Sequence, residues 1–213
     1  MGKEKVRVYD QTWQEYDKWY DSHPAIYQSE IKVLNKIVPP GRGLEIGVGT
    51  GRFASPLSVQ FGLDPSYNML KLARQRRIQV VQGNGEELPF KNETFQFILI
   101  VYTIELVDDT LLLLREAVRT LKKKGALILG IIDRESSWGK YYEKKIDQSP
   151  YYKHFHFFSP EEILAILKKI PLEFEKAYQT LLNPPPDIDD AEDPQSGFGE
   201  GGFVTLKAIK EES

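Results

Sequence analysis

The 213-residue sequence contains no cysteine, and this absence excludes a disulfide-stabilised scaffold and any zinc or iron–sulfur site with cysteine ligands. It has no excess of basic residues: 28 Lys and Arg against 31 Asp and Glu give a net charge of −3, which argues against a general nucleic-acid binder. The longest apolar stretches, 95–102 and 126–132, are too short to span a membrane, and residues 1–10 lack the apolar core of a signal peptide. We therefore expect a soluble, cytoplasmic protein.

Short apolar runs alternate with longer amphipathic ones. Segment 108–124 is typical of a helix, with acidic residues in its first turn, a cationic run in its last and Gly125 as its stop. This alternation predicts an α/β fold with a doubly wound, mostly parallel, seven-stranded sheet. The last two strands have no helix between them, which predicts a C-terminal antiparallel hairpin. The strands are expected at residues 43–46, 57–63, 78–82, 95–102, 126–132, 172–181 and 203–209.

A single domain over residues 1–213 is expected, divided into four parts. The first part would hold cap helices, with Ile31, Leu34 and Val38 on one helical face. A core that binds the ligand, an aromatic-rich cap insert, and a C-terminal helix with the strand hairpin would follow. The parts correspond to residues 1–40, 41–133, 134–160 and 161–213.

A glycine cluster follows the first strand, in the string Glu45-Ile46-Gly47-Val48-Gly49-Thr50-Gly51. Ligands of open α/β sheets bind at this edge, where glycine allows both sharp turns and close approach of the backbone. A dinucleotide fingerprint would need a glycine at the position of Arg52, and no Lys-Ser/Thr follows as in a phosphate-binding loop. Because Glu45 would repel a pyrophosphate, the loop favours a ligand with cationic or hydroxyl groups, such as S-adenosylmethionine.

The loop resembles the first motif of the class I S-adenosylmethionine-dependent methyltransferases. Segments 62–70, 83–90, 95–98 and 115–125 are similar to later motifs of that family, in matching order and spacing. The resemblance implies that Asp64 accepts from both ribose hydroxyls and that position 84, where Asn replaces the usual Asp, binds the adenine amino group. It implies S-adenosylmethionine as cofactor, S-adenosylhomocysteine as product, no metal, and a set of cofactor-binding residues: Glu45, Gly47, Gly49, Gly51, Asp64, Met69, Asn84, Gly85 and Tyr102.

The small-molecule branch, similar to quinone-biosynthesis methyltransferases, is the nearest resemblance, although its usual histidine near Leu106 is absent. We expect methyl transfer to an N, O or C atom of a small acceptor by in-line displacement, which depends on alignment and exclusion of water. A non-catalytic protein of the same fold that binds S-adenosylmethionine is the alternative. A macromolecule methyltransferase is disfavoured because residues 101–104 lack an Asn/Asp-Pro-Pro-Tyr/Phe motif.

Aromatic residues are concentrated on either side of the motif-bearing segment, and they predict a pocket for a planar or amine acceptor. His154 and His156 are interpreted as a structural or solvent-facing pair, because a metal would need further ligands. No catalytic residue and no oligomeric state follow from the sequence. The residues assigned to the acceptor pocket are Tyr16, Tyr20, Glu105, Trp138 and Tyr141, with Trp19 and Tyr142 as neighbouring candidates.

Overall fold

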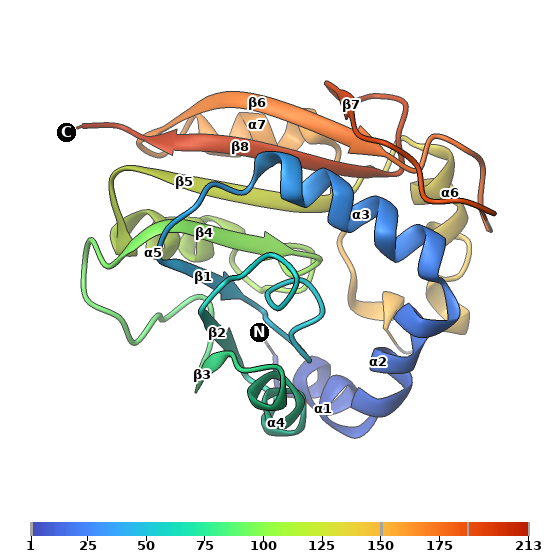
Figure 1. Cartoon of the computed structure of the whole chain (residues 1–213), viewed down its shortest axis with the longest axis horizontal. Helices are drawn as coiled ribbons and strands as arrows, with labels where there is room; N and C mark the ends of the chain where they lie inside the picture. Colours follow the sequence, from blue (N-terminus) through green and yellow to red (C-terminus); the bar gives the residue numbers. More distant parts are fainter. Residues whose placement is uncertain (1, 150, 187, 213) are drawn as a thin grey trace.

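A central eight-stranded sheet organises the chain in the computed structural model, which describes residues 2–149, 151–186 and 188–212. Its strand order is β3-β2-β1-β4-β5-β8-β6-β7 (Figure 1). The first five strands of that order are parallel, whereas β8 lies antiparallel between β5 and β6. The strands are β1 (Gly43–Ile46), β2 (Phe61–Asp64), β3 (Gln79–Gln82), β4 (Phe95–Val101), β5 (Leu121–Ile132), β6 (Leu172–Thr180), β7 (Gln195–Ser196) and β8 (Phe203–Lys210).

Helices cover both faces of this sheet. Helices α3 and α4 pack on one face, α5 and α7 pack on the other, and α2 and α6 lie beyond the carboxyl ends of the parallel strands (Figure 1). None of the helices in the described residues is long and apolar enough to cross a membrane. The helices are α1 (Lys3–Gln11), α2 (Trp13–Ser22), α3 (Pro24–Ile37), α4 (Tyr67–Gln75), α5 (Thr110–Thr120), α6 (Ser137–Glu143) and α7 (Pro160–Leu167), with 3₁₀ turns η1 (Ile146–Gln148) and η2 (Tyr152–His154).

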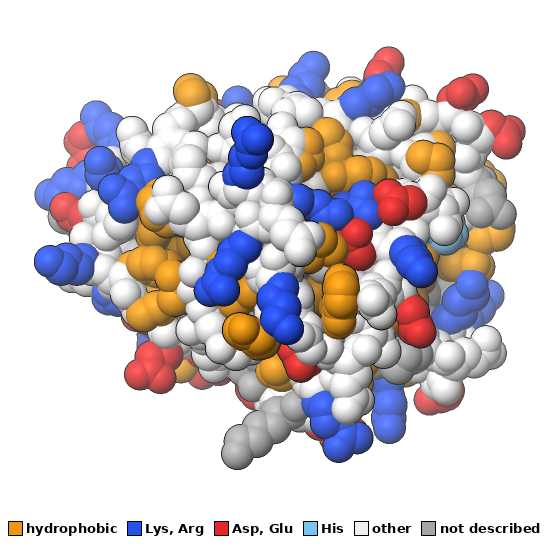
Figure 2. Space-filling model, turned by 60° about the horizontal axis from the view of Figure 1, so that its bottom comes forward, with side chains coloured by type: hydrophobic (Ala, Val, Ile, Leu, Met, Phe, Trp, Pro, Cys, Tyr) orange, Lys and Arg blue, Asp and Glu red, His pale blue; other side chains and the backbone are white. Residues whose placement is uncertain are grey.

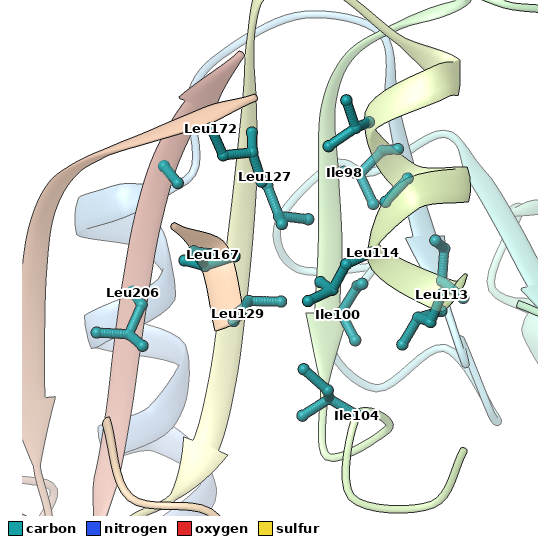
Figure 3. Close-up of a cluster of buried hydrophobic side chains, with 14 of the residues drawn as sticks. Ile98, Ile100, Ile104, Leu113, Leu114, Leu127, Leu129, Leu167, Leu172 and Leu206 are labelled. Atoms are coloured by element: carbon teal, nitrogen blue, oxygen red, sulfur yellow. The ribbon is translucent and has the colours of Figure 1, made fainter. Parts of the chain in front are cut away.

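Strand β4 shows why the middle of the sheet is buried on both sides. Phe97 and Leu99 point into the cluster beneath α3 and α4, and Ile98 and Ile100 point into the cluster beneath α5 and α7. Figure 3 shows Ile98 and Ile100 beside Leu113 and Leu114 of α5. The near-continuous apolar run in this strand is the pattern of a parallel strand covered by helices on both faces.

The structure confirms the α/β class and the C-terminal antiparallel strands, and it corrects several details. There are eight strands rather than seven within the described residues, because two residues of the long C-terminal loop pair with Tyr178 and Gln179 as β7. The helix expected at 108–124 ends at Thr120, because Leu121 already pairs with Phe95 in the sheet. Between the glycine loop and β2, residues 52–58 form turns.

The buried face of α3 also differs from the prediction. Ile31 and Val38 are only half-buried. The helix presents a different stripe to the sheet, formed by Ile26, Ser29, Glu30, Val33, Leu34 and Ile37. The acidic residue of this stripe, Glu30, lines the candidate site described below.

Candidate cofactor and acceptor site

A cavity of about 350 Å³ lies at the carboxyl ends of the parallel strands, against the N-terminal helices. Five of the predicted cofactor residues line it: Gly47, Gly49, Asp64, Met69 and Tyr102. Its position agrees with the rule that open α/β sheets bind ligands outside the carboxyl ends of their strands. On the face drawn in Figure 2, basic and acidic side chains are interspersed rather than gathered by sign.

The three glycines of the loop have different roles. All have positive φ: 75° at Gly47, 50° at Gly49 and 85° at Gly51. A Cβ at Gly47 would lie 2.0 Å from the Thr103 hydroxyl oxygen, and one at Gly51 would lie 2.5 Å from Ile78 Cδ1, so both positions require glycine for packing. Around Gly49 the nearest atom would be on the Tyr16 ring, at 3.7 Å. Gly49 therefore leaves open the part of the loop that a ligand can approach.

Asp64, the last residue of β2, is fixed by two backbone N–H groups. Gly49 N donates to one carboxylate oxygen at 2.9 Å, and Ser66 N donates to the other at 2.8 Å. Burial raises the pKa of Asp64 to about 6. Each oxygen keeps a further lone pair, so this carboxylate has the capacity to accept from both hydroxyls of a ribose. The open loop beside Gly49 and the fixed carboxylate fit S-adenosylmethionine.

The other four predicted cofactor residues lie outside the lining of this cavity: Glu45, Gly51, Asn84 and Gly85. Gly51 packs on Ile78 as described, and a Cβ at Gly85 would lie 2.7 Å from Leu113. Asn84 forms a turn in which its side-chain oxygen accepts from Glu86 N at 3.3 Å. Burial raises the pKa of Glu45 well above its usual value, while the Ala54 backbone N–H hydrogen-bonds to it. Their contact with the cofactor stays a prediction.

Helices α1 and α2 form a lid over the cavity, to which Tyr9, Tyr16 and Tyr20 contribute side chains. Arg52, directly after the glycine loop, donates to the Asp17 carboxylate of the lid at 2.7 and 2.9 Å. Arg76 donates to the same carboxylate at 2.8 and 2.9 Å, and these two cations lower the pKa of Asp17. The residue that breaks the dinucleotide pattern thus connects the loop to the lid.

Tyrosine rings from distant segments wall much of the cavity, and one of them, Tyr16, also lies beside Gly49 of the loop. The hydroxyls of Tyr16 and Tyr20 lie 2.9 Å apart, and the rings of Tyr142 and Tyr152 lie 4.8 Å apart. We call the part of the cavity lined by the following residues the tyrosine chamber: Tyr16, Tyr20, Glu30, Tyr102, Tyr142 and Tyr152. Tyr16 and Tyr20, which the sequence analysis assigned to an acceptor pocket, thus line the cavity, and their contact with an acceptor stays a prediction.

Three of the predicted pocket residues do not line the cavity. Trp138 is 1% exposed, donates its indole N–H to the Asn183 carbonyl at 2.8 Å and belongs to the core beneath α3. It contacts the ring of Tyr142, and thus supports the chamber wall from behind. Tyr141 packs against Lys145, outside the lining. Glu105 is 1% exposed, and burial raises its pKa to about 8.

Glu30 and Tyr152 are the chamber residues that the sequence analysis did not assign to a site, and Glu30 is the charged one. It is 2% exposed, and it accepts a hydrogen bond from the Tyr102 hydroxyl. The sequence did contain a sign of this burial. Glu30 lies on the same helical face as Ile26, Val33 and Leu34, so it is a charged residue within an apolar stripe. A charged residue at such a position is almost never fully buried unless it is paired or functional.

The histidines do not form a metal site in the described ranges 2–149, 151–186 and 188–212. No group of three or more His, Asp or Glu side chains there could hold a metal ion. His154 is half-buried and His156 is exposed.

Comparison with known proteins assigns the fold and the chemistry. Residues 44–129 match the family model of a methyltransferase domain. An uncharacterized protein of Methanocaldococcus jannaschii is 45% identical over 205 residues, covering 96% of this chain and 100% of that protein. A crystal structure from Thermotoga maritima, described as an S-adenosylmethionine-dependent methyltransferase and possible histamine N-methyltransferase, has a TM-score of 0.93 at 42% identity. That similarity covers 97% of this chain and 100% of the other.

The similarity to the quinone-biosynthesis type is more distant. A demethylmenaquinone methyltransferase of Oceanobacillus iheyensis is 26% identical over 229 residues, covering 95% of this chain and 90% of that protein. The family is thus shown at the level of cofactor chemistry, while the branch is not. The glycine loop, the fixed Asp64 and these comparisons together show that the chain belongs to the class I S-adenosylmethionine-dependent methyltransferases.

Proposed function

We propose that this methyltransferase transfers the methyl group to a small molecule that binds in the tyrosine chamber. The observation that carries the proposal is the continuity of the cavity, in which Gly49 and Asp64 share one space with the chamber tyrosines. A volume of about 350 Å³ and walls of aromatic rings suit a small ligand rather than a macromolecular segment.

The residues of this chain would bind and align the two partners. S-adenosylmethionine supplies a methyl group activated by a sulfonium. Asp64 and the backbone around Gly49 would hold its ribose, and Met69 would pack against it. The lid and the chamber rings would exclude water and place the acceptor in line, which is the main requirement of a displacement reaction.

The names of the relatives support a small-molecule acceptor. The Thermotoga maritima structure is described as a possible histamine N-methyltransferase, and the Oceanobacillus iheyensis relative is a demethylmenaquinone methyltransferase. Both names point to small acceptors, although their chemistry differs.

Calorimetry with S-adenosylmethionine, followed by transfer assays with the labelled cofactor, tests this proposal. The cofactor should bind the wild type, and Asp64→Ala should weaken binding by about 1.5–3 kcal/mol for each of the two hydroxyl hydrogen bonds lost, less any rescue by water. Labelled methyl should then appear in a product from pools of amines, phenols or quinol precursors. Cofactor binding without transfer to any pool would instead favour the non-catalytic alternative, and unchanged affinity in Asp64→Ala would remove Asp64 from the cofactor site.

A further inference from the structure

The charged side chains that line the cavity are all acidic. They are Glu15, Glu30 and Asp64, and no Lys, Arg or His is among the described lining residues. Asp64 is engaged by the glycine loop, and Glu15 is exposed. Glu30 is therefore the buried carboxyl group that the cofactor assignment leaves unexplained.

One oxygen of Glu30 lacks a partner in the described part of the chain. The Tyr102 hydroxyl donates to Oε1, whereas Oε2 has no hydrogen bond to any described residue and Glu30 forms no ion pair there. A buried acceptor without a partner is unfavourable unless a ligand satisfies it. Because Glu30 lines the cavity, a ligand in the chamber can reach it.

The backbone at Tyr102 maintains this pair. Tyr102 follows β4 with a φ of 52°, a conformation that is uncommon for a bulky residue, and its N–H donates to the Gly130 carbonyl at 3.0 Å. Such conformations are concentrated at functional sites, where the surrounding structure enforces them.

The titratable groups that interact electrostatically with Glu30 are tyrosines from α2, α3, α6 and η2 and the tyrosine that follows β4. Burial raises the pKa of each of them, so all are neutral at physiological pH: Tyr16, Tyr20, Tyr27, Tyr102, Tyr142 and Tyr152. Among the described residues no cation compensates the carboxyl group, and burial raises the pKa of Glu30 to about 8. A carboxyl group enclosed by aromatic rings suits a cationic ligand, which both the carboxylate and the ring faces attract.

We propose that the methyl acceptor is a small amine, and that Glu30, held by Tyr102, binds its nitrogen and takes its proton. This inference rests on the proposed function and names its substrate class. An anionic acceptor is disfavoured, because the lining residues that the structure describes include no cation to balance it.

The proton and electron balance is simple. The ammonium form gives one N–H proton to the Glu30 carboxylate and becomes a neutral amine with a free lone pair. That pair forms the new N–C bond, while the C–S bond of the sulfonium breaks and leaves its pair on sulfur. The product leaves as a methylated ammonium ion, and Glu30 keeps the proton that it took, which restores the protonated carboxyl group of the free protein.

Amine binding has a signature that does not depend on turnover. At about pH 7 the free amine carries a proton and Glu30 also carries one, whereas the bound pair shares a single proton. Binding should therefore release about one proton per amine. Calorimetry in two buffers of different ionisation enthalpy measures this number directly.

The probes are ring-bearing primary amines such as 2-phenylethylamine, each paired with the alcohol of the same shape, here 2-phenylethanol. In the wild type with S-adenosylhomocysteine present, at least one amine should bind about tenfold or more tightly than its alcohol and release a proton. In Glu30→Gln, which preserves the shape and the acceptor for Tyr102, both the preference and the proton release should vanish. Glu105→Gln is the matched control, because Glu105 is equally buried and its pKa is equally raised, but it does not line the cavity; proton release should persist.

Three results would overturn the inference. The first is that no amine binds more tightly than its alcohol. The second is proton release that persists in Glu30→Gln. The third is loss of S-adenosylhomocysteine affinity in Glu30→Gln, which would place Glu30 in the cofactor site. Methyl transfer to a phenol or quinol would reject the amine and leave the proposed function intact. An absence of transfer to every class would reject the proposed function instead.

Discussion

The loop end of the cavity and the tyrosine chamber are built from different parts of the chain. At the loop end, backbone groups supply the contacts: Gly49 N and Ser66 N donate to Asp64, and these residues lie at or just after the ends of β1 and β2. In the chamber, side chains from α2, α3, α6 and η2 meet the residue after β4. The first region is specified by local geometry, and the second by packing between distant segments. If the chamber binds the acceptor as proposed, we expect cofactor binding and acceptor choice to respond independently to substitutions.

Gly49→Val should have the largest effect and should act on the loop end alone. Its φ of 50° is strained for a β-branched residue, and the added methyl groups would project toward the cavity beside Tyr16. We expect S-adenosylmethionine affinity to fall by more than about 100-fold in calorimetry. Gly197→Val is the control, because Gly197 has a φ of 89° and nothing near its Cβ position. Normal cofactor binding by Gly49→Val would show that the loop does not contact the ligand.

Trp138→Ala should act on the folded structure rather than on either ligand. Its fully buried ring fills space beside Gly202 and supports Tyr142, so truncation should lower the free energy of unfolding by about 3–5 kcal/mol. Chemical denaturation measures this change, and cofactor affinity of the folded fraction should stay close to that of the wild type. Tyr141→Ala, outside both core clusters, should cost much less. Equal costs would contradict the assignment of Trp138 to the core.

Two of the buried carboxyl groups, Glu30 and Glu105, give the smallest effect, in the dependence of stability on pH. Because the pKa of Glu30 and of Glu105 is raised to about 8, the folded state binds more protons than the unfolded state between about pH 4.5 and 8. Stability should therefore fall as pH rises through that window. Each of Glu30→Gln and Glu105→Gln should make this fall shallower by up to about 1 kcal/mol per pH unit. Urea denaturation at pH values across the window checks this, and slopes unchanged from the wild type would contradict it.

The sequence predicted the sheet well where a strand is buried on both faces. The apolar runs of β4 and β5 are continuous because helices cover both sides, and such runs are visible without knowledge of partners. β7 could not be predicted, because two residues carry no periodicity. The end of α5 was also misplaced: its cationic run resembles a helical terminus, but pairing of Leu121 with Phe95 draws the chain into the sheet.

In the candidate site, too, some residues could be predicted from the sequence and others could not. Asp64 and Gly49 were predicted because the end of a strand determines where the next residues point. Trp138 and Glu30 were misassigned or missed because ring content and charge do not reveal which side chain faces a cavity and which faces the core. That choice depends on contacts such as the one between the Tyr151 hydroxyl and the Thr12 carbonyl, which are 139 positions apart.

By itself, the sequence determined the α/β class and the positions of the glycine loop and of Asp64 at the ends of strands. Strand periodicity and the turn after a strand are properties of neighbouring residues. Only the tertiary structure decided that Arg52 and Arg76 hold the lid through Asp17, that Trp138 lies in the core, and that Glu30 lies among the tyrosines. The physical reason is that burial and desolvation arise from the meeting of segments that are far apart in the chain, and no local pattern records which segments will meet.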